Sequence, residues 1–150
     1  MRVVIQKVKS ASVEVNDQLI GEINKGLVVL VGYESLDSIE DISWLAHKIV
    51  NMRIFDDSNG KLNLSVSDLN GEILLVSQFT LHASVKKGNR PSYIKAANSK
   101  KANQMYELTI SEFEKVLKRK ISTGKFGANM EVSLVNNGPV TITIDTKNKE

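Results

Sequence analysis

Residues 72–81 constrain the fold more than any other stretch, because they begin as a buried strand and end in polar side chains. An apolar, partly β-branched run follows the turn signal at residues 68–71, which is typical of a core strand. Ser77, Gln78 and Thr80 then interrupt the run. Side chains alternate along a strand, so we expect Gln78 and Thr80 on one face and Ser77 on the other. Because unpaired polar groups are costly to bury, this stretch alone favours a strand that ends in solvent.

The remaining patterns predict a strand-rich chain with two main helices. Alternating or apolar runs predict strands at residues 3–8, 11–15, 19–23, 27–31, 62–64, 131–135 and 140–144. The run at 27–31 is apolar on both faces, as in a central strand. Helical periodicity predicts helices over residues 37–52 and from Ser99 to about Lys118. No stretch is typical of a linker, so we expect a single compact α+β domain over residues 1–150, with a barrel-like, antiparallel or mixed sheet.

The first predicted helix has a recognisable start and a core face. Ser38 and Asp41 have the spacing of a capping box. The apolar side chains that recur at the helical period are Ile39, Ile42, Leu45, Ala46 and Ile49. Trp44 and His47 lie on the opposite side, where the indole is either a lone surface aromatic or a contact with a loop or another chain.

Composition restricts the chemistry. The chain has no cysteine, which excludes disulfides, thiolate metal sites and cysteine nucleophiles, and its two histidines disfavour a histidine-rich metal site. Asp56 and Asp57 lack further carboxylates at calcium-loop spacing, so we interpret them as a solvated turn. We therefore expect no metal and no cofactor. The sequence has no apolar run of membrane-spanning length and no signal-peptide pattern, which predicts a cytoplasmic protein without a membrane partner.

Three cations cluster in the loop predicted over residues 82–92. Lys86, Lys87 and Arg90 surround Gly88, which places positive charge beside backbone N–H groups. This combination suits a phosphate or the acceptor end of an RNA, and it equally suits an ordinary basic surface loop. The net charge of +3 permits an anionic partner without proving one.

Four short motifs carry a resemblance to a known family. They are Ser77-Gln78-Phe79-Thr80, Lys87-Gly88-Asn89-Arg90-Pro91-Ser92, Gly124-Lys125-Phe126-Gly127 and Asn137-Gly138-Pro139-Val140-Thr141. In this order, and over essentially the whole chain, they resemble the D-aminoacyl-tRNA deacylase family. The resemblance implies a homodimeric hydrolase that cleaves the ester bond of D-aminoacyl-tRNA, and also of mischarged glycyl-tRNA, and releases free tRNA and the amino acid.

The resemblance also implies roles for two of these motifs. The catalytic candidates are Ser77, Gln78, Phe79 and Thr80. They would line the pocket for the terminal adenosine and the ester, with backbone N–H groups, that of Phe79 in particular, as oxyanion donors. Gly138 and Pro139, with Asn137 beside them, would form a cis peptide segment that reaches into the active site of the other subunit and excludes an L side chain.

No catalytic base is visible in the sequence. The chain has neither a Gly-x-Ser-x-Gly elbow nor a legible serine–histidine–acid triad. An aminoacyl ester is already activated, its neighbouring ribose hydroxyl can assist, and one oxyanion donor contributes about 3 kcal/mol. Thr80 is therefore either a nucleophile or a positioning hydroxyl, and we favour positioning because nothing is available to activate it.

Two positions depart from the residues that are usual in the family. Asn137 stands where Asp is frequent and Lys7 where Arg is usual, and a lysine cannot reproduce a bidentate guanidinium contact. Any role of Lys7 in bracing the Gly-Pro segment therefore remains open. Two rival functions also remain. One is a noncatalytic RNA-binding protein that uses the tRNA-binding candidates Lys86, Lys87 and Arg90. The other is a general small-ester hydrolase, for which the sequence offers no catalytic base.

Overall fold

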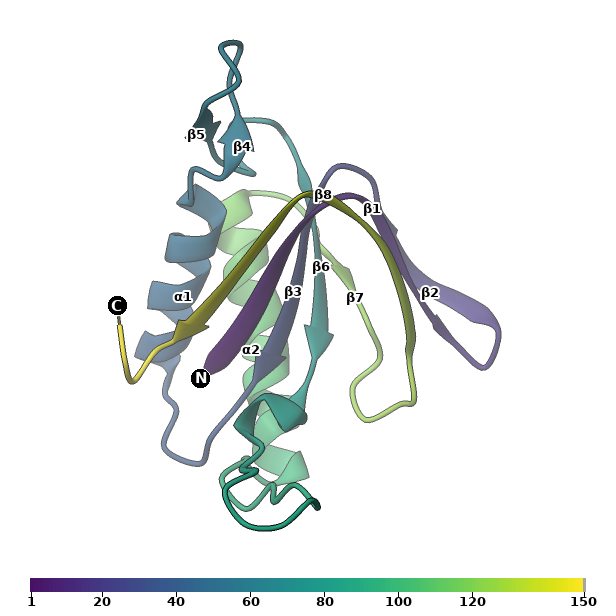
Figure 1. Cartoon of the computed structure of the whole chain (residues 1–150), viewed down its shortest axis with the longest axis vertical. Coiled ribbons are helices and arrows are strands. Elements are labelled where there is room, and N and C mark those ends of the chain that lie inside the picture. The colour runs from purple at the N-terminus through teal and green to yellow at the C-terminus, as the bar shows by residue number, and fades with distance from the viewer. Residues whose placement is uncertain (150) are drawn as a thin grey trace.

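The computed structural model describes residues 1–149 and shows a curled mixed sheet with two helices packed on one of its faces (Figure 1). The strands of the sheet are β1 (Arg2–Val15), β2 (Gln18–Ile23), β3 (Gly26–Gly32), β6 (Glu72–Ser77), β7 (Ser122–Thr123) and β8 (Glu131–Asp145). Their order is β2-β1-β3-β6-β7, and β8 pairs with the other edge of β1. The other elements are the helices α1 (Ile39–Asn51) and α2 (Ser99–Leu117), the 3-10 helix η1 (Phe79–His82), and a small hairpin of β4 (Phe55–Asp56) and β5 (Leu62–Leu64). Within residues 1–149, neither helix combines the length and the apolar character that crossing a membrane requires.

The centre of the sheet consists of β3 and β6, which pair in parallel. Their alternating side chains enter two separate cores, as strands covered on both faces require. The core beneath the helices contains Leu27, Val29, Val31, Ile73 and Leu75, and the core on the other face contains Val28, Leu74 and Val76. The prediction of a central strand at 27–31 is therefore confirmed, and so is the α+β class.

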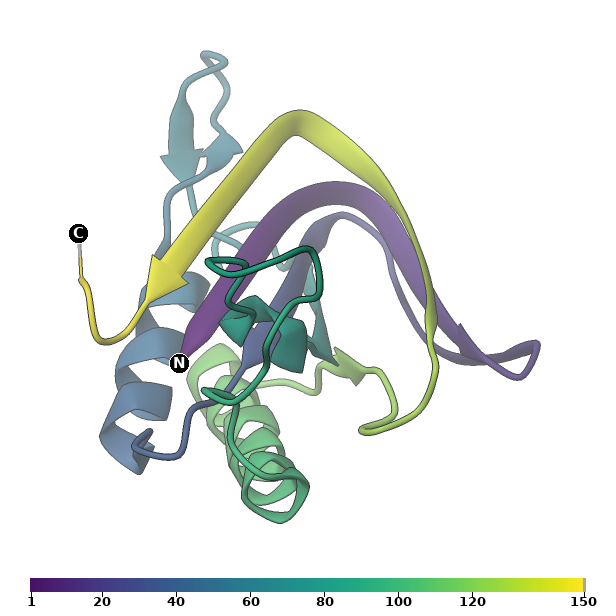
Figure 2. The same ribbon diagram turned by 60° about the horizontal axis from the view of Figure 1, so that its bottom comes forward.

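The path of β1 makes the sheet barrel-like. Its first half, residues 2–8, pairs with β3, and its second half, residues 11–15, pairs with β2. Register shifts near Val8 bend the strand between the two halves. The second half covers the face of β3 and β6 that points away from the helices, where Val13 and Ile23 join the second core. Figure 2 shows β1 and β8 bending together around this core.

Two pairs of predicted strands are in fact single strands. Residues 3–8 and 11–15 belong to one β1, because the bend changes the side-chain pattern without ending the ladder with β8. Residues 131–135 and 140–144 likewise belong to one β8, since both segments pair with β1. Residues 136–139, between the two predicted strands, therefore lie within β8 and do not separate two strands. Gln6 faces Thr141 and Val8 faces Asn136, so the residues between these two β8 positions form a bulge opposite Lys7.

The helices follow their sequence signals with local differences. The capping box of Ser38 and Asp41 is present at the start of α1. Ile39 was expected in the core but is 63% exposed, because it lies in the first turn of the helix. Trp44 is half-buried against the helical core, and Lys149 Nζ lies 4.5 Å from its ring centroid, so the indole contacts the C-terminal segment. At α2 the N-cap is Asn98, not Ser99, because the Asn98 side chain accepts the Lys101 N–H at 2.9 Å.

Candidate functional site

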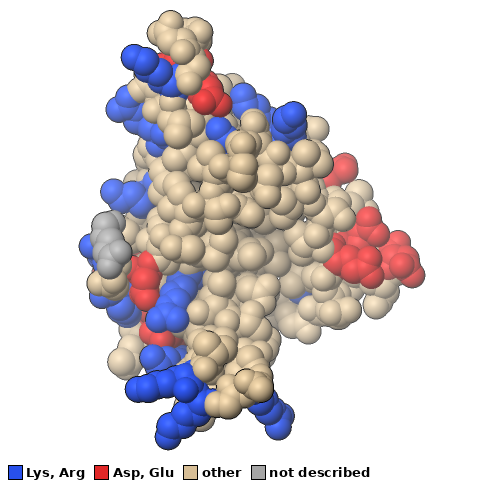
Figure 3. All heavy atoms as spheres, viewed as in Figure 1, with Lys and Arg blue, Asp and Glu red and all other residues tan. Residues whose placement is uncertain are grey.

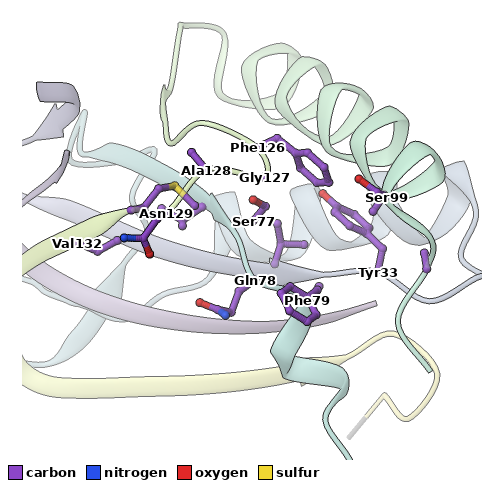
Figure 4. Close-up of a pocket in the computed structure, with 16 residues that line it drawn as sticks. Tyr33, Ser77, Gln78, Phe79, Ser99, Phe126, Gly127, Ala128, Asn129 and Val132 are labelled. Atoms are coloured by element: carbon purple, nitrogen blue, oxygen red, sulfur yellow. The ribbon is translucent and has the colours of Figure 1, made fainter. Parts of the chain in front are cut away.

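A cavity of about 580 Å³ opens at the carboxyl ends of β3 and β6, a common position for ligand sites in sheets with parallel strands. Its walls come from the ends of both strands, from the start of α2, and from the segment that leads into β8. Figure 4 shows Tyr33, Ser77, Gln78, Phe79 and Phe126 around this space. The volume falls within the range of about 300–1,000 Å³ that is typical of small-molecule sites.

The strand predicted over residues 72–81 ends at Ser77, and the chain turns into η1. Gln78 starts this turn with φ −145° and ψ 82°, and its N–H donates to Val31 O at 2.7 Å. The expected alternation of faces therefore stops at Ser77. Ser77, Gln78 and Phe79 line the cavity, whereas Thr80 does not. The structure thus brings three of the four catalytic candidates to the cavity and places the fourth directly behind them.

The turn leaves two backbone donors free. Within residues 1–149 the N–H groups of Phe79 and Thr80 donate to no backbone acceptor, whereas those of Leu81 and Ala83 are used within the turn. The first N–H groups of a helix lack intrahelical partners and favour negative charge. The start of η1 can therefore stabilise a developing negative charge.

The Thr80 hydroxyl is held by its neighbour. Gln78 Nε2 donates to Thr80 Oγ1 at 2.5 Å, which leaves the hydroxyl proton of Thr80 free to donate to a ligand. A neutral amide is not a base, so Gln78 cannot remove the Thr80 hydroxyl proton. His82, the one histidine near this segment in the sequence, has a buried ring that does not line the cavity, with Nδ1 3.2 Å from Glu34 Oε1.

Tyr33, which lines the cavity, and Tyr106, which does not, are also unsuited to acid–base chemistry. Burial raises the pKa of Tyr33 well above its ordinary value, and its hydroxyl donates to Thr109 Oγ1 at 2.9 Å. Burial likewise raises the pKa of Tyr106, whose hydroxyl donates to Leu75 O at 2.7 Å. Both groups stay neutral near pH 7 and are already engaged in hydrogen bonds, so the arrangement offers donors and shape but no proton acceptor.

Asn137, Gly138 and Pro139 lie in the β8 bulge and do not line the cavity. The Gly138–Pro139 peptide is cis, and Gly138 has φ +130°. Gly138 and Pro139 are exposed to solvent in the single chain. Within one chain, the structure therefore keeps the two predicted site motifs apart.

Lys7, opposite the bulge, is buried and has a partner that the sequence did not reveal. Lys7 is only 2% exposed, and its Nζ lies 3.3 Å from Asp56 Oδ2 and 5.8 Å from the centroid of the Phe55 ring. Asp56 lies in β4 and not in the predicted turn, although its side chain is 52% exposed. Asp57 does lie in that turn, where the backbone N–H groups of Lys61 and Asn59 lower the pKa of its carboxyl. Among residues 1–149 no cluster of acids and histidines has the arrangement of a metal site.

The cations Lys86, Lys87 and Arg90 are exposed on the connection between η1 and α2. Figure 3 shows Lys and Arg side chains gathered at the lower end of the molecule, where this connection lies, and acidic side chains over the β1–β2 hairpin. Tyr93, on the same connection, packs edge to face with Phe79.

The sequence analysis missed several cavity residues. Tyr33, Ala102, Phe126 and Met130 line the cavity, although no role was predicted for them. The motif at 124–127 contains Phe126, which forms part of the cavity wall. The spatial position of this motif depends on the pairing of β7 with β6, which no local pattern indicates.

Comparison with known proteins gives consistent matches over the full length. The family described as D-Tyr-tRNA(Tyr) deacylase matches residues 4–145. Proteins named D-aminoacyl-tRNA deacylase from Flavobacterium psychrophilum and Bacteroides fragilis are 57% and 56% identical over 150 residues, covering 100% of both chains in each case. A solved structure described as c-Myc DNA Unwinding Element Binding Protein has a TM-score of 0.92 at 39% identity and covers 97% of this chain and 98% of its own. A structure described as a probable eukaryotic D-amino acid tRNA deacylase has a TM-score of 0.85 at 16% identity, covers 95% of this chain and 97% of its own, and supports the fold.

Proposed function

The chain belongs to the D-Tyr-tRNA(Tyr) deacylase family and is a D-aminoacyl-tRNA deacylase, a carboxylic ester hydrolase, and we propose that it proofreads chirality by excluding L-aminoacyl esters from the cavity at η1. The observation that carries the proposal is the pair of free N–H groups at Phe79 and Thr80, beside a cavity large enough for a nucleoside ester. Glycyl-tRNA is also a substrate, because selection by exclusion of a side chain cannot reject an amino acid that has none.

The chemistry relies on the main chain. The ester carbonyl points at the free N–H groups of Phe79 and Thr80, which stabilise the oxyanion as water attacks. The Thr80 hydroxyl, held by Gln78, donates a further hydrogen bond and does not act as a nucleophile. Ser77 and Gln78 line the cavity beside the ester. Free tRNA and the amino acid leave as products.

The filter of chirality is Gly138-Pro139, donated across the twofold axis of a homodimer. Val132 of β8 lines the cavity, and Gly138 follows it by six residues in the same strand. Gly138 lies in the bulge opposite Lys7 and lines no part of the cavity of its own chain, so the proposed filter of that cavity comes from a second copy. The outer edge of β8 has no partner among residues 1–149, and Leu134 and Val135 on it are exposed. An unpaired edge with apolar side chains is a ready surface for a second copy of the chain.

Selectivity is tested with D-tyrosyl-, L-tyrosyl- and glycyl-tRNA offered side by side. We expect rapid hydrolysis of the D and glycyl esters and no hydrolysis of the L ester above the uncatalysed rate. Equal rates for the two tyrosyl esters would refute exclusion. If only the glycyl ester resisted hydrolysis, the inference that the filter selects by excluding a side chain would be refuted.

The cross-subunit arrangement is tested with a mixed dimer of two variants. A Cβ at Gly138 would lie 2.9 Å from Val140 N, so Gly138→Ala displaces the filter and should admit L-tyrosyl-tRNA. Ser77→Tyr, at a residue that lines the cavity, blocks the cavity of the other protomer. The one working cavity of the mixed dimer then belongs to the Gly138→Ala protomer and receives an unaltered filter from its neighbour. We expect hydrolysis of the D ester only, and cleavage of the L ester would show that the filter acts within its own chain.

The other functions considered predict different results. The exposed cations at Lys86, Lys87 and Arg90 also suit nucleic-acid binding without catalysis, and a similar structure is described as binding a DNA element. Thr80→Tyr separates the possibilities, because it should abolish turnover while binding of uncharged tRNA persists. A general esterase would cleave simple D-tyrosyl esters as fast as the nucleoside ester, which we do not expect. We further propose that the protein acts in the cytoplasm as one domain over residues 1–150, because aminoacylated tRNA is used there.

A further inference from the structure

An aromatic pair stands at the mouth of the cavity. The rings of Phe79 and Tyr93 have centroids 5.1 Å apart and an interplanar angle of 73°. In an edge-to-face pair, one ring presents its edge to the other, so each ring keeps at least one face that its partner does not cover. The Phe79 residue is 56% exposed and Tyr93 is 40% exposed. Two open aromatic faces therefore lie beside the cavity, where Figure 4 shows Phe79.

The loop that carries Tyr93 holds an unusual concentration of positive charge. Residues 83–98 contain four cations and no acidic residue, whereas the rest of the chain has sixteen cations and seventeen acids. The four are Lys86, Lys87, Arg90 and Lys95. Among residues 1–149, none of them pairs with a carboxylate. The net positive charge of the protein is therefore concentrated next to the aromatic pair.

Open aromatic faces beside unpaired cations are the combination that binds single-stranded nucleic acid. Bases stack on the rings without regard to sequence, and cations follow the phosphates. A polyanion is also guided to this loop by the acidic β1–β2 hairpin at the other side of the molecule (Figure 3). The 3′ end of a tRNA is single-stranded, and its last nucleoside carries the amino acid.

We propose that Tyr93, with Phe79, forms a stacking platform for the bases of the nucleotides that precede the terminal adenosine, and that the four loop cations bind their phosphates. This inference rests on the proposed function, because it places the terminal adenosine and its ester in the cavity. The platform gives the enzyme affinity for the acceptor strand that no contact with the amino acid can supply. It accepts any tRNA, since stacking does not read base edges.

The test compares two substrates across three variants. D-tyrosyl-tRNA contains the upstream nucleotides, and D-tyrosyl-adenosine lacks them. Stacking on one ring contributes enough for an effect of about tenfold, so Tyr93→Leu should raise KM for the tRNA ester about tenfold and lower kcat/KM about tenfold more for that ester than for the adenosine ester. Tyr93→Phe should restore the wild-type KM, because it keeps the ring. Ile94→Ala is the control, since Ile94 is 92% exposed beside Tyr93 but carries no ring.

A second arm leaves the protein unchanged. Its substrate is a D-tyrosyl-tRNA with abasic residues in place of the two nucleotides before the terminal adenosine. The wild-type KM for this substrate should equal the KM of Tyr93→Leu for the intact D-tyrosyl-tRNA. The KM of Tyr93→Leu should be the same for both substrates. Equal losses on both substrates would mean that Tyr93 only supports η1, and an unchanged KM would mean that the rings bind nothing. Either result overturns the platform. Failure of the wild type on D-tyrosyl-adenosine would contradict the proposed cavity chemistry instead.

Discussion

The hydrogen bond between Gln78 and Thr80 leads to a prediction that separates a positioning hydroxyl from a nucleophile. Thr80→Val removes the hydroxyl and keeps the shape, and Thr80→Ser keeps the hydroxyl. Because Gln78 Nε2 donates to Thr80 Oγ1 at 2.5 Å, the hydroxyl proton is directed away from Gln78 and toward a ligand. We expect Thr80→Val to slow hydrolysis and Thr80→Ser to retain most of the activity.

The size of the effect distinguishes the two roles. A hydrogen bond to a neutral group contributes about 1 kcal/mol, and one to a developing oxyanion about 3 kcal/mol. Thr80→Val should therefore lower kcat by roughly 5-fold to 150-fold. Removal of a true nucleophile has cost about a million-fold in a serine hydrolase. These two ranges do not overlap.

Gln78→Glu provides the matched perturbation. An ionised carboxylate only accepts hydrogen bonds, so it captures the Thr80 proton instead of donating to the Thr80 oxygen. We expect kcat to fall at least as far as in Thr80→Val, and the effect of Gln78→Glu to be smaller in the Thr80→Val background. The measurement is single-turnover hydrolysis of D-tyrosyl-tRNA at saturating enzyme. A loss of ten-thousand-fold or more in Thr80→Val, or full additivity of the two substitutions, would refute the reasoning.

Three further predictions concern stability and the position of η1. Burial raises the pKa of Asp41, but hydrogen bonds, first that from the Lys147 ammonium, lower it to about 2. The ionised carboxylate therefore stabilises the fold above about pH 4, and this effect is lost as the pH falls toward 2. Asp41→Asn should lower the free energy of unfolding, measured with urea, by about 1–2 kcal/mol at pH 7 and by much less at pH 2. Asp56→Asn leaves the buried Lys7 ammonium unpaired and should destabilise the protein by about 1–3 kcal/mol in thermal unfolding, and Lys7→Met should suppress that loss. A Cβ at Gly32 would lie 2.7 Å from Gln78 O, so Gly32→Ala should displace η1 and lower kcat at least tenfold, while urea unfolding shows a loss of only about 1–3 kcal/mol; an unchanged kcat would contradict the role of η1.

Local signals predicted the central part of the fold well. The apolar run at 27–31 and the start of the 72–81 stretch became β3 and β6, because a strand covered on both faces has a pattern that tertiary structure does not change. The two helices also follow their periodicity, and α1 starts with the predicted capping box. These features depend on nearby residues, and nearby residues are what a sequence pattern reports.

The features that failed depend on distant partners. The two halves of β8 could have paired with each other as a hairpin, and only their shared pairing with β1, at separations from 117 residues (Glu14 and Glu131) to 143 residues (Arg2 and Asp145), decides otherwise. The end of β6 depends on its ladder with β3, whose last hydrogen bond runs from Gln78 N–H to Val31 O. Lys7 is buried against Asp56, 49 positions along the chain, and no pattern around either residue indicates the pair. The site motifs could be recognised from the sequence, but their separation within one chain could not.

The start of η1 and the Gly138-Pro139 segment are held by different parts of the sheet. The N–H groups at the start of η1 follow the ladder of β6 with β3, which ends in the hydrogen bond from Gln78 N–H to Val31 O, whereas Gly138-Pro139 lies in the bulge of β8 opposite β1. Within residues 1–149 no hydrogen bond joins η1 to residues 136–140. Under the proposed mechanism, changes that move η1 should therefore alter the rate for every ester by one factor, and changes at the bulge should alter the ratio between D and L esters. Because the proposed filter is made of backbone, its selectivity should tolerate changes of side chain that leave the backbone in place.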